Sequence, residues 1–393
     1  MRRSIRRNVS VLLVGLVLSI NPPVWSWGNT GHEAVACAAW KLLDQATKDK
    51  IWALLQQVPS RKSADGTKII PGFKEWTANL PANLTEDEQH MWVFMRAATY
   101  PDSLKHTFLE DSDTVPSNMD EATANLGFTD KQSHGYWHFV NTAFGTVTTP
   151  GGTPPQAPKS CASQAAKPAS ELPATPGVNA ATEITLLSHA MVAGESAGLM
   201  AYDMMWLEHL VGDVHQPLHA AVRFVDGVGD LGGNCVVIKV PATLAAHLKV
   251  GDPRATPPAE LHAFWDDLPG VGDPMSATPN AVQYAGSLPP ADSTLVKTSD
   301  PQAWVNESFS MAKSDAYVAP IGDGLGVPTA FVITQAYYNT AAADAQQRIA
   351  LAGARLANLL ASVLNGTPPA SGAQGAKPVH HRPAHKPPTS TGL

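Results

Sequence analysis

The stretch HLVGDVHQPLH, residues 209–219, decides how this sequence is interpreted. The apolar segment TEITLLSHAMVAGESAGLMAYDMMWLE precedes it, and together they predict one long helix from 181 to about 216. On that helix His209 and Asp213 are four residues apart and share a face, so both can bind one metal ion. Pro217 must end or kink the helix, because proline lacks the N–H and clashes with the preceding turn. His219 is thereby free to serve a neighbouring ion.

His215 lies in the same block and competes with His219 for the ligand role. Alternatively, it orients the other ligands through its second ring nitrogen. Three histidines and one aspartate in eleven mostly apolar residues are unusual for ordinary helix side chains, because each buried polar group needs a partner. The block therefore predicts a metal site.

Further candidate ligands occur far from this block. In LHAFWDD, His262 and Asp266 are again four apart on a predicted helix. WHFVN contributes His138, and YPDSLK contributes Asp102 in a predicted loop. Each of these signals is weak by itself, and the HExxxC run that begins at His32 is not the HExxH motif of zinc proteases.

The N-terminus predicts export. MRRSIRRN is basic, VSVLLVGLVLSI (9–20) is apolar, and Ser26 is a small residue at the expected cleavage point. This pattern predicts a signal peptide over 1–26 and a secreted or periplasmic protein, with a retained membrane anchor as the alternative. Cleavage would leave Trp27 with a free α-amine that can bind a metal together with its own carbonyl, and His32 could complete that set.

Composition excludes a basic nucleic-acid scaffold. The chain has 27 Lys and Arg against 34 Asp and Glu, and residues 1–26 contain four Arg and no acidic residue. The processed chain therefore carries 23 basic and 34 acidic residues, a net charge of −11. Any positive charge that attracts phosphate must then come largely from bound metal. Of the three cysteines, Cys37 is expected to be buried in a helix, and Cys161 and Cys235 could form a bridge.

The pattern along the chain predicts a mainly α fold with one domain, residues 27–365. Helices are expected at 32–58, 85–97, 181–216, 257–267, 301–313 and 329–364, with a small hairpin within 226–241. The first turn of 85–97, TEDE, is a capping-box start. Residues 145–180 are rich in Pro, Ala and Thr and predict an extended loop, and 366–393 predicts a disordered tail rich in Pro and His.

These residues together closely resemble the zinc-dependent single-strand-specific nucleases of the S1/P1 type, within the zinc phospholipase C/nuclease superfamily. That family begins its mature chain with Trp-Gly and a His at the sixth position, like Trp27, Gly28 and His32. Its H-x-x-x-D-x-H-Q-P-L-H block is matched without gaps by 209–219, and its H-x-x-W-D segment by 262–266. The stretch RIALAGARLANLL also looks like its closing helix. The resemblance spans roughly 27 to 365.

The resemblance implies a multi-helix bundle with a trinuclear zinc site. By position, a first Zn²⁺ would be held by Asp102, His138 and His209. A second would be held by Trp27 (amine and carbonyl) and His32, with Asp213 bridging the pair. The third would be held by His219, His262 and Asp266.

The implied activity is hydrolysis of single-stranded DNA and RNA to 5′-phosphorylated nucleotides, and the resemblance also allows removal of the 3′-phosphate from 3′-mononucleotides. Asp213 and Asp102 would be catalytic, the latter by orienting or deprotonating the attacking water. Phe139 matches the family's base-stacking aromatic, Leu231 is a candidate opposite wall, and Asn234 is a further candidate substrate contact. The expected protein is a monomer without a stable protein partner, and without membrane association after processing.

Two positions depart from the fungal members of this family. Asn141 replaces an Asp, so a general base would have to be Asp102, Asp213 or metal-activated water, and Asp267 replaces an Asn. Two other functions remain open. A zinc phospholipase C also begins with Trp, although its first His lies farther along and its last ligand is a Glu. A non-catalytic exported zinc-binding protein would use the histidines of the tail, His380, His381 and His385.

Overall fold

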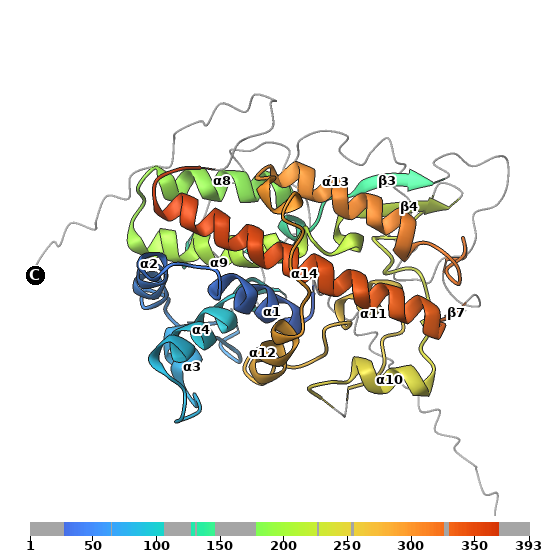
Figure 1. The fold of residues 1–393 in the computed structure, drawn as a ribbon, viewed down its shortest axis with the longest axis horizontal. Coiled ribbons are helices and arrows are strands. Elements are labelled where there is room, and N and C mark those ends of the chain that lie inside the picture. The colour runs from blue at the N-terminus through green and yellow to red at the C-terminus, as the bar shows by residue number, and fades with distance from the viewer. Residues whose placement is uncertain are drawn as a thin grey trace, which may run out of the picture.

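Two central helices are buried on nearly every side. From Ala201 to its end, α9 (Ala197–Asp213) is wholly buried, and α1 (Asn29–Trp40) buries all but one of its residues. A helix that is apolar all round must be covered on all faces. Accordingly α8 (Ala180–Val192) packs on α9, while α4 (Glu86–Ala97), α12 (Thr278–Gly286) and α14 (Gln335–Leu364) pack on α1 (Figure 1).

The computed structural model describes residues 27–63, 65–105, 127–129, 132–145, 178–225, 228–252, 255–325 and 330–368. The other helices are α2 (Gln45–Leu55), α3 (Phe73–Thr77), α5 (Tyr100–Leu104), η1 (Gly135–His138), η3 (Pro217–Ala220), α10 (Ala242–Leu248), α11 (Leu261–Asp266), η4 (Leu295–Lys297), α13 (Pro301–Met311) and the π-turn η5 (Ala312–Ala316). The predicted mainly α architecture is confirmed. None of the described helices combines the length and apolar character that a membrane span requires.

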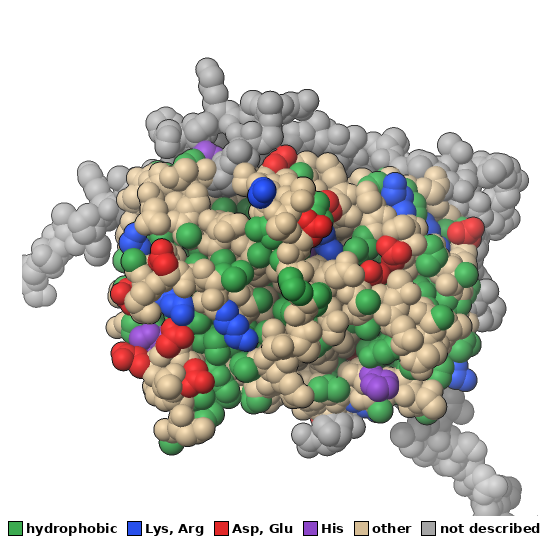
Figure 2. Space-filling model, in the orientation of Figure 1, with side chains coloured by type: hydrophobic (Ala, Val, Ile, Leu, Met, Phe, Trp, Pro, Cys, Tyr) green, Lys and Arg blue, Asp and Glu red, His purple; other side chains and the backbone are tan. Residues whose placement is uncertain are grey.

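The contact between α1 and the long α14 depends on a glycine. A Cβ at Gly353 would lie 2.5 Å from the Cβ of Ala38, so any side chain there would push the two helices apart. Around this contact the buried apolar side chains form one continuous cluster. Its largest fully buried members are seven tryptophans: Trp27, Trp40, Trp76, Trp137, Trp206, Trp265 and Trp304. The face over α14 carries scattered rather than gathered charges (Figure 2).

The predicted helix over 32–58 is two helices. The chain turns after Trp40, and Asp44 begins α2 by accepting a hydrogen bond from the N–H of Thr47. A local capping interaction thus overrides a continuous apolar pattern. The capping box predicted at the start of 85–97 is confirmed, because Thr85 and Glu88 satisfy each other's backbone N–H groups.

The predicted helix over 181–216 is also interrupted. α8 ends at Val192, Gly194 adopts a positive φ of 86°, and α9 begins at Ala197. α9 then ends at Asp213, so the stop before Pro217 is confirmed. The predicted helices over 257–267 and 301–313 are shorter, as α11 and α13, and the last predicted helix starts at Gln335, capped by the Thr334 side chain.

The strands are short and partly parallel. β4 (Ala221–Val225) pairs antiparallel with β5 (Val228–Gly229), so the hairpin begins earlier than the predicted segment 226–241. Within that segment Val237 forms an isolated antiparallel bridge with Glu260. β4 also pairs in parallel with β3 (Thr142–Gly145). β6 (Ile238–Lys239) pairs in parallel with β7 (Phe331–Val332), a distant partner that no local pattern specifies.

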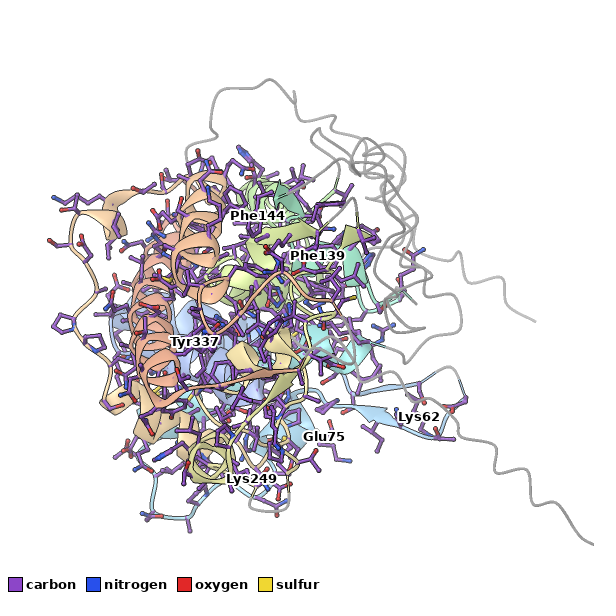
Figure 3. All side chains as sticks on the ribbon, turned by 90° about the vertical axis from the view of Figure 1, so that its right-hand side faces the viewer. Lys62, Glu75, Phe139, Phe144, Lys249 and Tyr337 are labelled. Carbon is purple, nitrogen blue, oxygen red and sulfur yellow. The ribbon has the colours of Figure 1, made fainter. Side chains whose placement is uncertain are left out.

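A separate two-stranded hairpin, β1 (Arg61–Lys62) and β2 (Ile69–Ile70), projects from the helical body with Lys62 on it (Figure 3). Several predictions fall outside the described residues: the signal peptide 1–26, most of the loop 145–180 and nearly all of the tail. Among the cysteines, Cys37 is a free buried thiol and Cys235 is in a disulfide, whereas Cys161 lies outside the described residues.

Glu183 on α8 provides a test of the core's electrostatics. Its side chain is buried, and this burial raises the pKa of its carboxyl to about 8. In the unfolded chain the pKa returns to its ordinary value near 4.5, so the unfolded state loses the proton first and stability falls as pH rises between these values. We expect Glu183→Gln to raise the free energy of unfolding at pH 7 by up to about 3 kcal/mol, with little effect near pH 4.5. The measurement is chemical denaturation at both pH values, with Asp49→Asn at an exposed position as the control. Equal changes in the free energy of unfolding for the two variants would contradict this prediction.

Candidate metal centre

The last turns of α9 present two potential ligands to the interior. His209 and Asp213 are fully buried, and Nε2 of His209 lies 3.4 Å from Oδ2 of Asp213. Gly212 lies between them, and a Cβ at that position would lie 2.8 Å from Nδ1 of His32. This absence of a side chain lets the His32 ring stack on the His209 ring, at 3.8 Å between centroids. The shared face predicted for His209 and Asp213 is therefore present.

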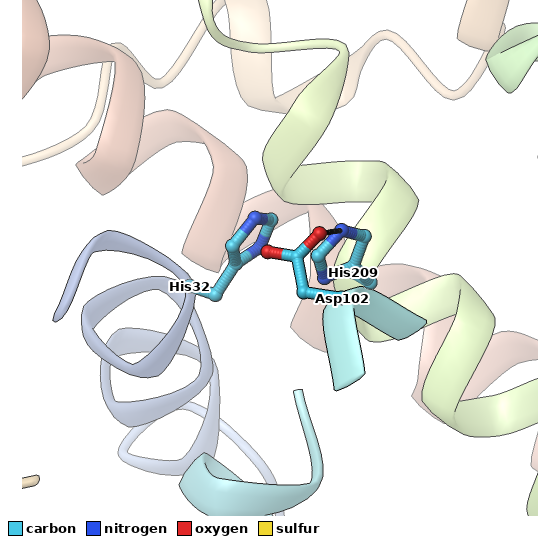
Figure 4. Close-up of side chains that lie close together, drawn as sticks. All are labelled: His32, Asp102 and His209. Carbon is cyan, nitrogen blue, oxygen red and sulfur yellow. Dashed lines mark ion pairs between the residues drawn. The ribbon is translucent and has the colours of Figure 1, made fainter. Parts of the chain in front are cut away.

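Three side chains from other elements meet these two. His32 comes from α1, Asp102 from α5 and His138 from the end of η1. His32 Nε2 is 3.4 Å from Asp213 Oδ1, and Asp102 Oδ1 is 3.4 Å from His209 Nε2. His138 Nδ1 lies 3.0 Å from both Asp213 Oδ2 and His209 Nε2. Figure 4 shows His32, Asp102 and His209 pointing toward one another from three separate helices.

These ligand atoms form two overlapping groups that share His209. One contains His32, Asp102 and His209, and the other contains His138, His209 and Asp213; within each group the atoms lie within 4.8 Å of one another. The sequence divided the same residues differently between the first two ions, with Asp102, His138 and His209 on one of them. The structure brings all five together, and that division stays a prediction.

A third group lies beside the first two. His219 on η3 and His262 on α11 bring their Nε2 atoms within 3.2 Å, and His262 Nε2 is 3.6 Å from Asp266 Oδ2. His219 also approaches Asp213, with its Nδ1 3.9 Å from Asp213 Oδ1. All three residues predicted for the third ion are thus close together, although forty-three positions separate His219 from His262.

Hydrogen bonds orient three of the imidazoles in the same way. In each, Nδ1 contacts a backbone carbonyl, which can only accept, so Nδ1 carries the proton and Nε2 presents its lone pair to the centre. The pairs are His209 with Ala98 (2.8 Å), His219 with His138 (2.6 Å) and His262 with Gly232 (2.6 Å). This arrangement fixes ring orientation in metal-binding histidines.

The positions of the polar atoms fit a bound cation. The Nε2 atoms of His219 and His262 face each other with bare lone pairs, which repel unless a positive ion lies between them. A tetrahedral zinc with bonds of about 2.0–2.1 Å holds its ligands roughly 3.3 Å apart, close to the observed separation. In addition, Oδ2 of Asp266 is buried without a hydrogen-bond partner among the described residues. Leaving a buried carboxylate oxygen unpaired costs free energy, which a bound cation would offset.

The two buried aspartates of the first groups are ionised. Burial alone would raise the pKa of Asp102, but the charges of Lys105 and His209 outweigh it and hold that pKa well below its usual value. Burial would likewise raise the pKa of Asp213, but the charge of His209 and a hydrogen bond with His138 hold it well below its usual value. Both carboxylates are therefore charged and able to bind metal at neutral pH.

The imidazoles differ in their protonation. Burial lowers the pKa of His32 to about 4 and that of His138 to about 3, so both are neutral ligands across the physiological range. Burial also opposes the charge on His209, but Asp213 and Asp102 outweigh it and raise the pKa of His209 above its usual value. Protonation therefore competes with metal binding at His209 more than at His32 or His138, which weakens the site as pH falls.

The competing candidate His215 faces away from the ligand groups. Its Nδ1 contacts the carbonyl of Val211 at 2.7 Å, and its Nε2 accepts a hydrogen bond from Arg355 at 2.9 Å. Arg348 donates to the backbone carbonyl of His215 at 3.2 Å. Both ring nitrogens are thus occupied, which excludes a ligand role. Instead, the two arginines of α14 hold the turn that follows Asp213.

Two side chains at the centre were not predicted from the sequence. Lys105 places its ammonium 2.6 Å from Asp102 Oδ1. Gln216 donates to Asp266 Oδ1 at 2.8 Å, and its own carbonyl oxygen accepts from the N–H of Leu218. A basic residue three positions after Asp102 was a readable signal for Lys105. Nothing local indicated Gln216, because its partner lies fifty positions away.

Gln216 fixes which oxygen of Asp266 is free. Because Oδ1 is held by the Gln216 amide, Oδ2 is left for a metal ion. We expect Gln216→Leu to weaken the third ion's affinity by about 10–100-fold, the range seen when such outer partners are removed. Metal analysis after dialysis should show less bound metal in Gln216→Leu than in Gln302→Leu, an exposed-site control. Equal metal content in the two variants would contradict the assignment.

The predicted substrate contacts surround these groups at half-buried positions. Phe139 directly follows His138, and its neighbour Val140 donates its N–H to the carbonyl of His219 at 2.7 Å. Leu231 has a positive φ of 54° and precedes Gly232, the carbonyl partner of His262. Asn234 donates its side-chain amide to the Leu231 carbonyl at 2.7 Å, so it also holds the turn.

The two departing positions differ in environment. Asn141 is exposed and directly precedes β3. Asp267 follows Asp266 at the end of α11, and burial raises the pKa of its carboxyl to about 7. Trp27 lies two residues before the first residue of α1, and its side chain is fully buried. The N–H of the next residue, Gly28, donates to the carbonyl of Asp266 at 3.1 Å. The segment that begins at Trp27, the predicted first residue after cleavage, is therefore tied to the third ligand group.

Comparison with known proteins gives a consistent result. The family model described as S1/P1 nuclease matches residues 27–365. Among curated proteins, the chain is similar to Endonuclease 2 of Arabidopsis thaliana, with 25% identity over 176 residues. That alignment covers 44% of this chain and 56% of the relative, so it spans little more than half of the relative's length.

Proposed function

This chain belongs to the S1/P1 nuclease family, and from that premise we propose that it is a zinc-dependent phosphodiesterase that hydrolyses single-stranded DNA and RNA to 5′-phosphorylated nucleotides. The observation that carries the proposal is the pair of overlapping His/Asp groups around His209, with a third group next to them. Adjacent metal sites suit in-line displacement at phosphorus, because both the attacking and the leaving oxygen need stabilisation.

Three Zn²⁺ ions are proposed, since buried imidazole and carboxylate ligands are typical of catalytic zinc. When bound, zinc lowers the pKa of water toward neutrality and offsets the negative charge of a phosphodiester. The proposed ligands are Trp27, His32, Asp102, His138, His209, Asp213, His219, His262 and Asp266. The orphaned Oδ2 of Asp266 and the aligned Nε2 atoms support this set.

Three charged residues would act directly on the reaction. Asp213 contacts His32, His138 and His209, which suits a carboxylate that bridges the close pair. Asp102 is ionised beside Lys105, so its carboxylate can orient the attacking water, although its lowered pKa disfavours a role as the proton acceptor. The Lys105 ammonium would add positive charge where the phosphate binds.

Preference for single strands would come from base stacking. A base can stack on Phe139 only if it is splayed out of a duplex, and Leu231 would form the opposite wall, with Asn234 as a polar contact. Removal of a 3′-phosphate from a 3′-mononucleotide would use the same centre, because the bond is also a phosphoester. Residues 1–26 would direct export and be cut before Trp27, so the protein would act outside the cytoplasm as a monomer.

The test is hydrolysis of single-stranded DNA and RNA by the processed chain, 27–393, before and after chelation and zinc restoration. We expect chelation to abolish hydrolysis and zinc to restore it, with 5′-mononucleotides among the products. If the zinc-loaded protein hydrolyses neither polymer, the proposal that its substrate is a single-stranded nucleic acid is wrong. Phosphatidylcholine vesicles in parallel would then distinguish a phospholipase C from a zinc-binding protein without turnover.

A further inference from the structure

The β1–β2 hairpin carries a concentration of positive charge on an acidic protein. Between residues 57 and 74, four basic residues (Arg61, Lys62, Lys68 and Lys74) stand against one acidic residue, Asp65, whereas the whole chain has a net charge of −7. Glu75 follows directly and is engaged by Ser60 and the N–H of Gly72 at the start of α3. Lys62 and Lys68 are exposed, and among the described residues neither forms an ion pair.

The hairpin's acidic residue, Asp65, forms hydrogen bonds within the turn between the two strands. Asp65 accepts hydrogen bonds from Ser63 (2.5 Å) and from the N–H of Thr67 (3.0 Å), and these bonds lower the pKa of its carboxyl to about 2. Ser63 in turn accepts from the N–H of Lys68 at 2.9 Å. The turn therefore has a defined shape. Lys62 lies on β1 opposite Ile69, and Lys68 lies in the turn directly before β2, so the two exposed ammonium groups extend from opposite faces of the hairpin near its tip.

The hairpin is attached to the helix that carries part of the metal centre. β2 packs against α5, and Arg61 donates to the hydroxyl of Tyr100, the first residue of α5, at 3.4 Å. Lys105, which contacts Asp102, directly follows the other end of α5. The hairpin therefore contacts the side chain of the first residue of α5, and Lys105 follows its last residue, with Asp102 between them on the same short helix.

This arrangement suits a strand that extends beyond the reacting phosphate. The chain as a whole is acidic, which disfavours binding of a polyanion, and the face over α14 carries scattered charges of both signs (Figure 2). The hairpin stands out from the body with Lys62 exposed (Figure 3). Proteins that bind single strands typically combine aromatic side chains that stack on bases with a positively charged groove along the phosphate backbone. The metal centre provides positive charge only at the phosphate that is cleaved, so neighbouring phosphates need other basic residues.

We propose that Arg61, Lys62 and Lys68 of the β1–β2 hairpin bind backbone phosphates of a single-stranded nucleic acid next to the phosphate that is cleaved. This inference rests on the proposed function and adds a subsite to it. A dinucleoside monophosphate contains only the scissile phosphate, so it cannot use the hairpin. A longer strand can, and its binding should depend on salt.

The test compares Lys62→Gln/Lys68→Gln with Lys297→Gln/Lys313→Gln. Both double variants remove two exposed positive charges, but Lys297 and Lys313 lie on η4 and η5, which pack against α14. For an oligonucleotide of roughly 12 residues, we expect the hairpin variant to raise KM about tenfold at about 50 mM salt. The slope of log KM against log salt concentration should be smaller than that of the wild type by about 1.4, or about 0.7 for each lysine removed. Hydrolysis of the dinucleoside monophosphate should stay at the wild-type rate.

If the two double variants have equal KM values and equal salt dependence, the proposed hairpin subsite is wrong, but the proposed nuclease activity is unaffected. Failure of wild-type protein on both substrates would overturn the proposed function instead. Fluorescence anisotropy with a labelled oligonucleotide and chelated protein tests the hairpin independently of turnover. Binding that weakens with salt in the wild type, and is reduced only in the hairpin variant, supports the subsite; identical binding by all three proteins contradicts it.

Discussion

Asp213→Asn is expected to reduce hydrolysis of single-stranded DNA by about a thousandfold or more. The Asp213 carboxylate lies 3.0 Å from His138 and 3.4 Å from both His32 and His209, in a fully buried position. Asparagine keeps the shape but removes the charge that balances these ligands and any ions they hold. It also replaces one ligand oxygen with an amide nitrogen that cannot bind metal.

The matched control is Asp203→Asn, the same change at another buried position of α9 outside the three ligand groups. We expect this control to keep its activity within a few-fold, and thermal unfolding of both variants separates lost chemistry from lost fold. The steady-state kcat on an oligonucleotide and the zinc content are the measurements. If Asp213→Asn loses some zinc but turns over substrate at the wild-type rate, its proposed role at the close pair is wrong.

A second large effect is expected at Trp27, the proposed N-terminus after signal-peptide cleavage. One extra residue ahead of Trp27 should lower activity by about 100-fold, because it converts the α-amine into an amide that cannot deprotonate near neutral pH and bind zinc. The surrounding contacts leave little room for adjustment. The Trp27 side chain is fully buried, and the adjoining N–H of Gly28 is held by Asp266.

The control is a chain whose extra residue is removed by a specific protease, which should recover both activity and zinc content. Adding the same residue after Leu393 should have no effect, because the position is remote in sequence from every proposed ligand. Full activity of the extended chain would show that the Trp27 amine is not a ligand. Zinc analysis of the extended chain then tells whether one ion is lost or all three.

Local rules predicted the features that depend on neighbouring residues. The four-residue spacing of His209 and Asp213 specifies a shared helix face in any context, and the same is true of His262 and Asp266. The stop before Pro217 and the capping box at Thr85 are equally local, because they depend on groups within one turn. Where local rules failed, as at residues 41–44 and 193–196, a cap or a positive-φ glycine interrupted a continuous apolar pattern.

Other features depend on partners far away in the sequence. The parallel pairing of β3 with β4 and of β6 with β7 joins segments that no local pattern relates. Gln216 acquires its role from Asp266, and His215 is turned from the centre by Arg355 and Arg348. A spacing argument treats His215 and His219 alike, since both follow the same helix, so only the packing of α14 distinguishes them.

By itself, the sequence predicted the helical class and the pairs His209/Asp213 and His262/Asp266, because residue chemistry and helical period are local properties. The resemblance to a known family gathered the remaining candidate ligands into one set. Only the tertiary structure decided which ring nitrogen each histidine presents, because the backbone carbonyls of Ala98, His138 and Gly232 that hold them come from other elements. It also decided that His209 is shared by two ligand groups. Those outcomes depend on how α1, α5, α9 and α11 pack, and packing is a property of the whole chain.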